Sequence, residues 1–135
     1  MIRNPDRRAI LAQPLLALFG VAANAQAPAA FMQRAFEMKR LAEAAGDQSY
    51  GAALVAEGRI VAESPSKVVV ERDATAHAEM STLRLAVKAG APTRGAVLYS
   101  TSIPCAMCQA EAAKLGVARM IYGAALTDGG APRGR

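Results

Sequence analysis

One histidine and two cysteines of this chain have the spacing of a metal site. His77 stands two residues before Glu79, whereas Cys105 and Cys108 follow a proline and, three residues apart, share one face of a helix. Three ligands of the histidine and cysteine type leave a fourth tetrahedral position of zinc open for water, as in catalytic sites. Zinc lowers the pKa of bound water to about 7, and a carboxylate that is not a ligand can take and return the proton. The pattern predicts one Zn²⁺ per chain on His77, Cys105 and Cys108, and it makes Glu79 the catalytic acid and base.

Each part of this pattern has another interpretation when it is taken alone. A single histidine is most often a surface or core residue, and a glutamate on a helix is most often solvated. A C-x-x-C pair in an exported protein could be a disulfide or a thioredoxin-like redox pair. A thioredoxin-like pair would be expected after the first strand and next to Trp or Gly-Pro, and this C-x-x-C has neither the position nor the context. The joint occurrence of all four residues at expected helix starts favours zinc.

The elements that must position these residues follow from hydrophobic periodicity and turn signals. Helical patterns cover residues 29–45, 76–88 and 104–115, and strand patterns cover 50–56, 59–63, 96–101 and 117–124. Glu57-Gly58 is expected as a tight turn, Ser64-Pro65-Ser66 as the end of the second strand, and Asp73 or Thr75 as a helix cap. We expect residues 68–70 to be loop or a strand fragment, and the tail from Leu126 to be loop.

This alternation predicts an α/β fold in which helices cover the faces of one sheet. Each of two helices is expected to follow a strand of that sheet, so two adjacent strand-to-helix crossings can converge on one point. One of these helices begins near His77 and the other near Cys105. A helix N-terminus stabilises a thiolate, which is the form of cysteine that binds metal.

Length and charge limit the other function classes. With 135 residues the chain is expected to form one domain over residues 28–135. The net charge is +5, but removing Arg3, Arg7 and Arg8 together with Asp6 leaves +3. That charge is mild, tryptophan is absent and no run of five basic residues occurs, so we do not expect nucleic acid as a partner.

Residues 1–27 have the order of an export signal: a positive start, a weakly apolar stretch and small residues. We expect cleavage after Ala25 and a periplasmic or secreted mature protein without a membrane span. The pair Arg7-Arg8 followed by apolar residues resembles a twin-arginine signal, the route of folded, cofactor-loaded proteins. The alternative is a cytoplasmic protein with an apolar N-terminal helix.

From Tyr50 to Ala124 the sequence resembles the cytidine-deaminase-like superfamily, on the branch of guanine deaminases and tRNA adenosine deaminases. Two segments carry the resemblance, Asp73-Ala74-Thr75-Ala76-His77-Ala78-Glu79-Met80 and Leu98-Tyr99-Ser100-Thr101-Ser102-Ile103-Pro104-Cys105-Ala106-Met107-Cys108. They contain the H-x-E and P-C-x-x-C signatures of zinc deaminases. The resemblance implies a three-layer α/β/α sandwich with a central mixed sheet, and frequent homodimers. It also implies hydrolytic release of ammonia from an amino-substituted nucleobase, nucleoside or similar small heterocycle.

The resemblance further makes Tyr50, Ser66 and Ala78 candidate substrate-binding residues. Ser66 stands where guanine- and adenosine-acting members usually have an asparagine that binds the base, and serine cannot present an amide donor and acceptor together. Ile103 stands where the family commonly has glutamate, and the chain ends eleven residues after Ala124, from which we expect a more open pocket or one completed by a partner. A non-catalytic zinc-binding domain of the same fold is therefore the alternative function, and a periplasmic thiol redox protein is a third.

Overall fold

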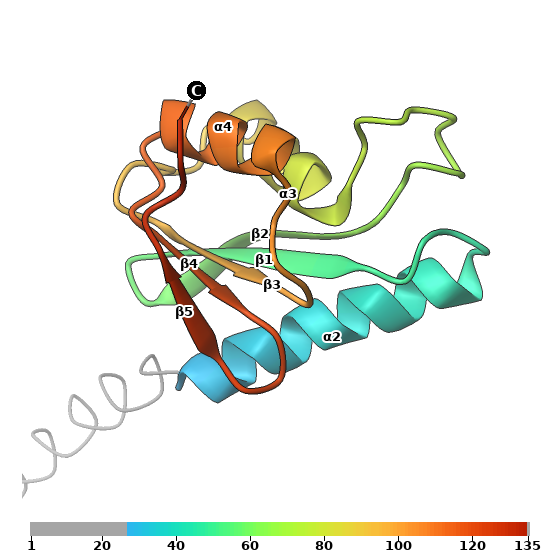
Figure 1. The fold of residues 1–135 in the computed structure, drawn as a ribbon, viewed down its shortest axis with the longest axis horizontal. Helices are drawn as coiled ribbons and strands as arrows, with labels where there is room; N and C mark the ends of the chain where they lie inside the picture. The colour runs from blue at the N-terminus through green and yellow to red at the C-terminus, as the bar shows by residue number, and fades with distance from the viewer. Residues whose placement is uncertain (1–26, 135) are drawn as a thin grey trace, which may run out of the picture.

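The computed structural model describes residues 27–134, and the predicted export signal lies outside the described residues except for its last position. The described chain contains helices α2 (Pro28–Ala44), α3 (Ala78–Lys88) and α4 (Ala106–Lys114), and strands β1 (Gly51–Ala56), β2 (Arg59–Pro65), β3 (Val97–Ser100), β4 (Arg119–Tyr122) and β5 (Thr127–Gly130) (Figure 1). Across residues 27–134, every helix is too short or too polar to cross a bilayer.

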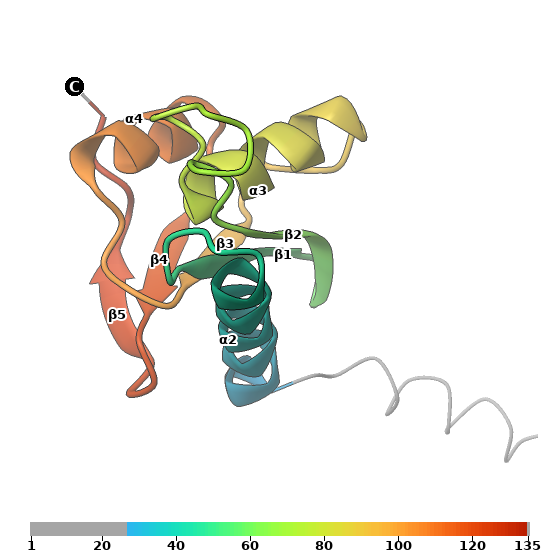
Figure 2. The same ribbon diagram turned by 90° about the vertical axis from the view of Figure 1, so that its right-hand side faces the viewer.

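The strands form one mixed sheet in the order β2-β1-β3-β4-β5. Strand β3 pairs with β4 in parallel, while the remaining neighbours are antiparallel. Helix α2 lies on one face of the sheet, and α3 and α4 lie on the other (Figures 1 and 2). This arrangement confirms the predicted three-layer α/β/α fold with a central mixed sheet.

Strand β1 carries the hydrophobic core because it lies inside the sheet and all six of its residues are buried. Successive side chains of a strand point to opposite faces. Ala52, Leu54 and Ala56 accordingly join the core cluster that includes residues of α3 and α4, whereas Ala53 and Val55 join the cluster under α2. The two helical layers are thus fixed to the same strand.

Helix α2 packs directly on the first residue of β1. A Cβ atom at Gly51 would lie 2.1 Å from the Ala35 carbonyl oxygen and 2.3 Å from the Lys39 backbone nitrogen. Glycine is therefore needed for this close approach of helix and strand. The contact also fixes the chain segment that enters β1, which includes Tyr50.

Most predicted elements are confirmed within two or three residues at their ends, and the Glu57-Gly58 turn is present with positive φ at both residues. Strand β2, however, continues through Ser64 to Pro65, where the sequence predicted its end. Proline is tolerated because β2 is an edge strand that pairs only with β1. Residues 68–70 form a turn rather than a strand fragment.

The prediction of a loop for the tail from Leu126 was wrong, because residues 127–130 form β5. Their sequence, Thr-Asp-Gly-Gly, has low strand propensity, but pairing with β4 satisfies backbone groups that would otherwise lie at an open sheet edge.

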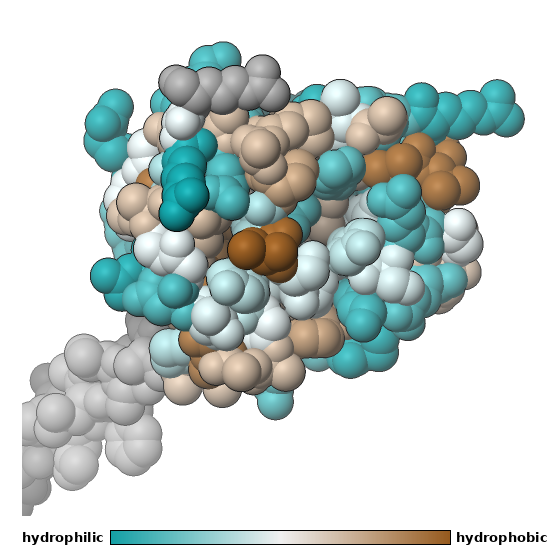
Figure 3. All heavy atoms as spheres, in the orientation of Figure 1, coloured by the Kyte–Doolittle hydropathy of each residue, from teal (hydrophilic) through white to brown (hydrophobic). Residues whose placement is uncertain are grey.

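Figure 3 shows the surface of the molecule in the orientation of Figure 1. On this face, hydrophobic residues occur in small groups separated by hydrophilic ones.

Candidate metal centre and active site

His77 lies at the N-cap of α3, immediately after a loop fixed by side-chain hydrogen bonds. Asp73 Oδ1 accepts from the backbone nitrogen of Thr75 at 2.9 Å and from its hydroxyl at 2.6 Å. The hydroxyl and backbone bonds from Thr75 hold the pKa of Asp73 below its ordinary value. The prediction that Asp73 or Thr75 caps the helix was therefore wrong: both residues shape the turn that delivers His77 to the cap position, and α3 begins at Ala78.

Cys105 is the N-cap of α4 and Cys108 lies in its first turn, because the helix begins at Ala106, two residues later than predicted. Gln109 donates from Nε2 to the Pro104 carbonyl oxygen at 2.9 Å, which ties the first turn of α4 to the chain that enters it. Cys105 is exposed and Cys108 is fully buried. Both thiols are free, so neither forms a disulfide.

The three predicted ligands converge on one point. Nδ1 of His77 lies 3.5 Å from Sγ of Cys105 and 3.7 Å from Sγ of Cys108. One ligand atom from each residue lies within 4.8 Å of the other two. Bond lengths of about 2.3 Å for Zn–S and 2.0–2.1 Å for Zn–N, at a tetrahedral angle, require a sulfur-to-nitrogen separation of roughly 3.6 Å. The two sulfur-to-nitrogen distances of this chain therefore match those that a zinc ion requires.

Glu79 lies beside the ligands and is held by a residue of the sheet. Its side chain is 5% exposed, and its Oε1 accepts a hydrogen bond of 2.6 Å from the Ser100 hydroxyl. Its Oε2 lies 4.0 Å from Sγ of Cys108. Ser100, at the end of β3, was not predicted as a functional residue, although it lies within the sequence segment that carries the second motif. Its position at a strand end next to a helix start was the signal available.

The surroundings of Cys108 favour its protonated thiol in the absence of a metal ion. Burial raises the pKa of the Cys108 thiol, and the neighbouring Glu79 carboxylate raises it further. A bound metal ion reverses this effect, because a coordinating thiol is deprotonated. The N-terminus of α4 adds a smaller stabilisation of the thiolate.

A cavity of about 270 Å³ opens over this group. It is lined by Gln48, Tyr50, His77, Glu79, Ser102, Ile103 and Cys105. A larger cavity of about 600 Å³ lies between α2 and the residues around Leu126, but neither histidine nor cysteine lines it. The smaller cavity is the candidate active site, since it contains the ligand group and the carboxylate.

The three candidate substrate-binding residues take different positions. Tyr50 is 45% exposed and lines the cavity. Ala78 is fully buried as the first residue of α3, where a backbone N–H has no partner inside the helix. Ser66 is buried, is absent from the cavity lining, and donates from its hydroxyl to Asp47 Oδ1 at 2.8 Å. Ile103 is 63% exposed at the rim and makes that part of the cavity apolar.

Comparison with known proteins agrees with this geometry. Residues 25–124 match the family described as the cytidine and deoxycytidylate deaminase zinc-binding region. A tRNA-specific adenosine deaminase of Agrobacterium fabrum is 39% identical over 103 residues, which are 75% of this chain and 68% of that protein.

Two solved structures share the fold. One comes from a study of A-to-I editing by tRNA:A34 deaminases, and it has a TM-score of 0.65 and 37% identity over 68% of this chain and 72% of that one. The other is a guanine deaminase from Bacillus subtilis, with a TM-score of 0.68 and 31% identity over 73% of this chain and 65% of that one.

Proposed function

Because the chain belongs to the cytidine and deoxycytidylate deaminase zinc-binding family and is a zinc-dependent deaminase, we propose that Glu79 moves the protons of its reaction. The reaction is hydrolysis of a C–N bond, in which water replaces an amino group on a ring carbon and ammonia leaves. The observation that carries the proposal is the position of Glu79, buried beside the ligand group and hydrogen-bonded by Ser100.

His77, Cys105 and Cys108 are the residues that would hold the zinc ion. When bound, zinc supplies a Lewis acid that activates water as the nucleophile. Because one of the two sulfurs is buried and the other is exposed, the group faces the cavity on one side only. Substrate can reach the open side of the group from the cavity.

The two carboxylate oxygens of Glu79 have different roles: one accepts the hydrogen bond that orients the side chain, and the other transfers protons. Ser100 donates to Oε1, which fixes the orientation of the carboxylate. Oε2 is left to take a proton from the attacking water and pass it to the ring nitrogen, and then to move the second hydrogen of that water to the departing amino group. The C–N bond breaks as the C=O bond forms, so one hydrogen of water ends on the ring nitrogen and the other on ammonia. A positioned acid and base of this kind contributes about 10²- to 10⁴-fold to a rate.

The alternative functions fit these observations less well. A non-catalytic zinc domain would have no use for a buried carboxylate held by a second buried side chain, since that burial is costly without a function. A thiol redox protein would not need His77 within 3.5–3.7 Å of both sulfurs.

The cavity supports a small, uncharged amino-heterocycle as substrate. Its walls outside the catalytic group are Gln48, Tyr50, Ser102 and Ile103, none of which is charged. A volume of about 270 Å³ is at the small end for ligand sites. The prediction that nucleic acid is not a partner stays a prediction, since relatives of this chain are named for their action on tRNA.

The test is ammonia release by zinc-loaded protein from purines, pyrimidines, their nucleosides, pterins and an anticodon stem-loop RNA. We expect a small heterocycle to be deaminated, and Glu79→Gln to lose at least ~10²-fold of that activity while it keeps zinc and fold. Activity on the RNA alone would overturn the proposed substrate class. An active Glu79→Gln variant would overturn the role of Glu79.

We also propose two further properties, export of the protein and its assembly as a homodimer. Export to the periplasm, by the twin-arginine route, concerns residues outside the described part of the chain. A homodimer is the state implied by the family resemblance, and sedimentation equilibrium of the mature protein tests it.

A further inference from the structure

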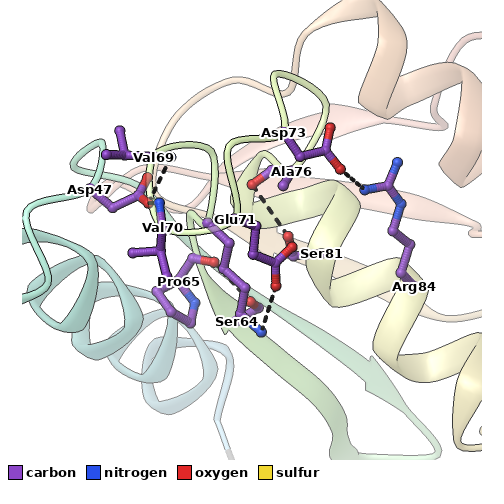
Figure 4. Close-up of polar contacts among 11 residues, drawn as sticks. Asp47, Ser64, Pro65, Val69, Val70, Glu71, Asp73, Ala76, Ser81 and Arg84 are labelled. Carbon is purple, nitrogen blue, oxygen red and sulfur yellow. Dashed lines mark hydrogen bonds and ion pairs between the residues drawn. The ribbon is translucent and has the colours of Figure 1, made fainter.

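Asp47, just after α2, gathers an unusual number of hydrogen bonds for an aspartate outside the catalytic group. Its Oδ1 accepts from the Ser66 hydroxyl at 2.8 Å and from the Gln48 backbone nitrogen at 2.8 Å. Its Oδ2 accepts from the backbone nitrogens of Val69 at 2.9 Å and Val70 at 2.8 Å. Figure 4 shows the carboxylate pointing at the backbone of the loop that carries the two valines. One side chain thus joins two segments about 20 residues apart in the sequence.

The first of these segments forms a wall of the active-site cavity. Gln48 and Tyr50, which line the cavity, follow Asp47 directly. A backbone hydrogen bond of 3.0 Å from the Ser66 nitrogen to the Tyr50 carbonyl oxygen joins the same two segments. Two contacts therefore position Tyr50: the packing of the neighbouring Gly51 on α2, and the contact between residues 47–50 and the loop of residues 66–72.

Apart from the bonds to Asp47, this end of the loop is attached by backbone hydrogen bonds of 3.0 Å from Ser66 to Tyr50 and from Lys67 to Ala76. Val69 is 54% exposed and Val70 is 60% exposed, so apolar burial does not hold them. The loop is folded on itself by backbone hydrogen bonds from Glu71 to Lys67 and from Arg72 to Val69. The loop is therefore a compact unit, and the Asp47 carboxylate adds side-chain bonds to the backbone bond that joins Ser66 to Tyr50 of the cavity wall.

The other end of the loop is tied to α3. Arg84 donates to Asp73 Oδ2 at 3.3 Å, and Ser81 donates to the Ala76 carbonyl oxygen at 3.3 Å (Figure 4). Arg84 also donates to the Thr75 hydroxyl at 2.9 Å. These bonds fix the approach to His77 without help from Asp47. Loss of Asp47 should therefore disturb the cavity wall while it leaves the ligand group in place.

Although desolvation alone raises the pKa of Asp47, hydrogen bonds from Val70, Gln48, Ser66 and Val69 outweigh it and hold that pKa below its ordinary value. The carboxylate is thus ionised at neutral pH and accepts all four bonds. The Ser66 hydroxyl uses its one proton in this contact, which explains why it is not directed into the cavity.

We propose that Asp47 is a positioning residue for the deamination reaction: its carboxylate fixes the loop of residues 66–72 against residues 48–50 and so sets the wall against which the substrate binds. The proposal rests on the cavity being the substrate site, as in the proposed function. It predicts an effect on substrate binding, seen in KM, and little effect on the chemical step, seen in kcat.

The first test is amide hydrogen exchange of zinc-loaded protein, which needs no substrate. In Asp47→Ala no side-chain oxygen is left to accept from the backbone N–H groups of Val69 and Val70, so exchange at these two amides should accelerate roughly tenfold, the scale of one hydrogen bond. Exchange at Ser66 should also accelerate, because its N–H bonds to Tyr50 across the same contact. Unchanged exchange at these three amides would overturn the proposal.

Asp128→Ala is the matched control, since Asp128 also accepts a backbone N–H, from Gly130 at 2.9 Å, and pairs with Arg119 at 3.3 Å on β4 and β5. It should leave exchange in residues 66–72 as in the wild type. Acceleration there in both variants would mean a general loss of stability and would overturn the proposal.

The second test uses the compound that the wild type deaminates best. Asp47→Ala should raise KM roughly tenfold, keep kcat within about threefold and keep one zinc per chain. A fall in kcat together with loss of zinc would assign Asp47 a structural role instead. If the wild type deaminates no compound, the proposed function fails, and the exchange experiment still decides whether Asp47 fixes the loop.

Discussion

Replacing Ser100 by alanine removes the hydroxyl that orients the proposed catalytic carboxylate. The hydrogen bond from Ser100 to Oε1 of Glu79 is 2.6 Å long, and the two residues are 1% and 5% exposed. Water cannot replace the lost donor easily in such a buried position. A hydrogen bond to a charged group contributes about 1.5–3 kcal/mol, and at about 1.4 kcal/mol per tenfold change the loss corresponds to roughly 10- to 150-fold in rate.

The assay is steady-state ammonia release by zinc-loaded Ser100→Ala, with zinc content measured on the same sample. We expect kcat to fall roughly 10- to 150-fold. The zinc content should stay at one per chain, because the described hydrogen bond of the Ser100 side chain is to Glu79 and not to His77, Cys105 or Cys108. Ser64→Ala is the matched control. Ser64 is also fully buried, and its hydroxyl donates a hydrogen bond of 2.8 Å to the Pro65 carbonyl oxygen. Neither Ser64 nor Pro65 lines the active-site cavity. A kcat for Ser100→Ala within twofold of the Ser64→Ala value would refute the reasoning.

Three other outcomes follow from the structure and the sequence. Gly51→Ala should lower the stability by about 1–3 kcal/mol in thermal unfolding, because the added methyl group would meet α2 at 2.1 Å; an unchanged Tm would contradict the close approach. Since the folded-state pKa of Asp47 lies below its ordinary value of 3.8, its hydrogen bonds should persist above that value and be lost as pH falls through the lower pKa, which acid titration of Val70 amide exchange will show. A reporter that must fold before export should reach the periplasm when fused to residues 1–27, and Arg7→Lys with Arg8→Lys should block it; continued export of that variant would contradict the twin-arginine route.

The metal centre could be predicted from the sequence because its information is local. Ligand type and spacing identify His77, Cys105 and Cys108, and a strand or loop before each helix brings the helix starts together. The structure adds the atom that faces the sulfurs, Nδ1 of the histidine. It also shows that caps and turns shift both helix starts by two residues, which places His77 and Cys105 at N-caps and Cys108 in the first turn of α4.

The supporting contacts could not be predicted, because they join residues far apart in sequence. Ser100 and Glu79 are separated by 21 positions, and Ser66 and Asp47 by 19, and no local pattern links either pair. Strand β5 was missed for a related reason: its residues have low strand propensity, and only the open edge of β4 makes them a strand. Tertiary context decided each of these features.

X-ray absorption at the zinc edge tests the metal centre most directly. The protein should bind one zinc per chain with two sulfur ligands at about 2.3 Å and two nitrogen or oxygen ligands at about 2.0–2.1 Å. Cys108→Ser should remove one sulfur or lose the metal, since Cys108 is the buried ligand. Zinc-supplied protein that holds no zinc, or zinc surrounded by four sulfurs or by none, would contradict a zinc ion held by His77, Cys105 and Cys108.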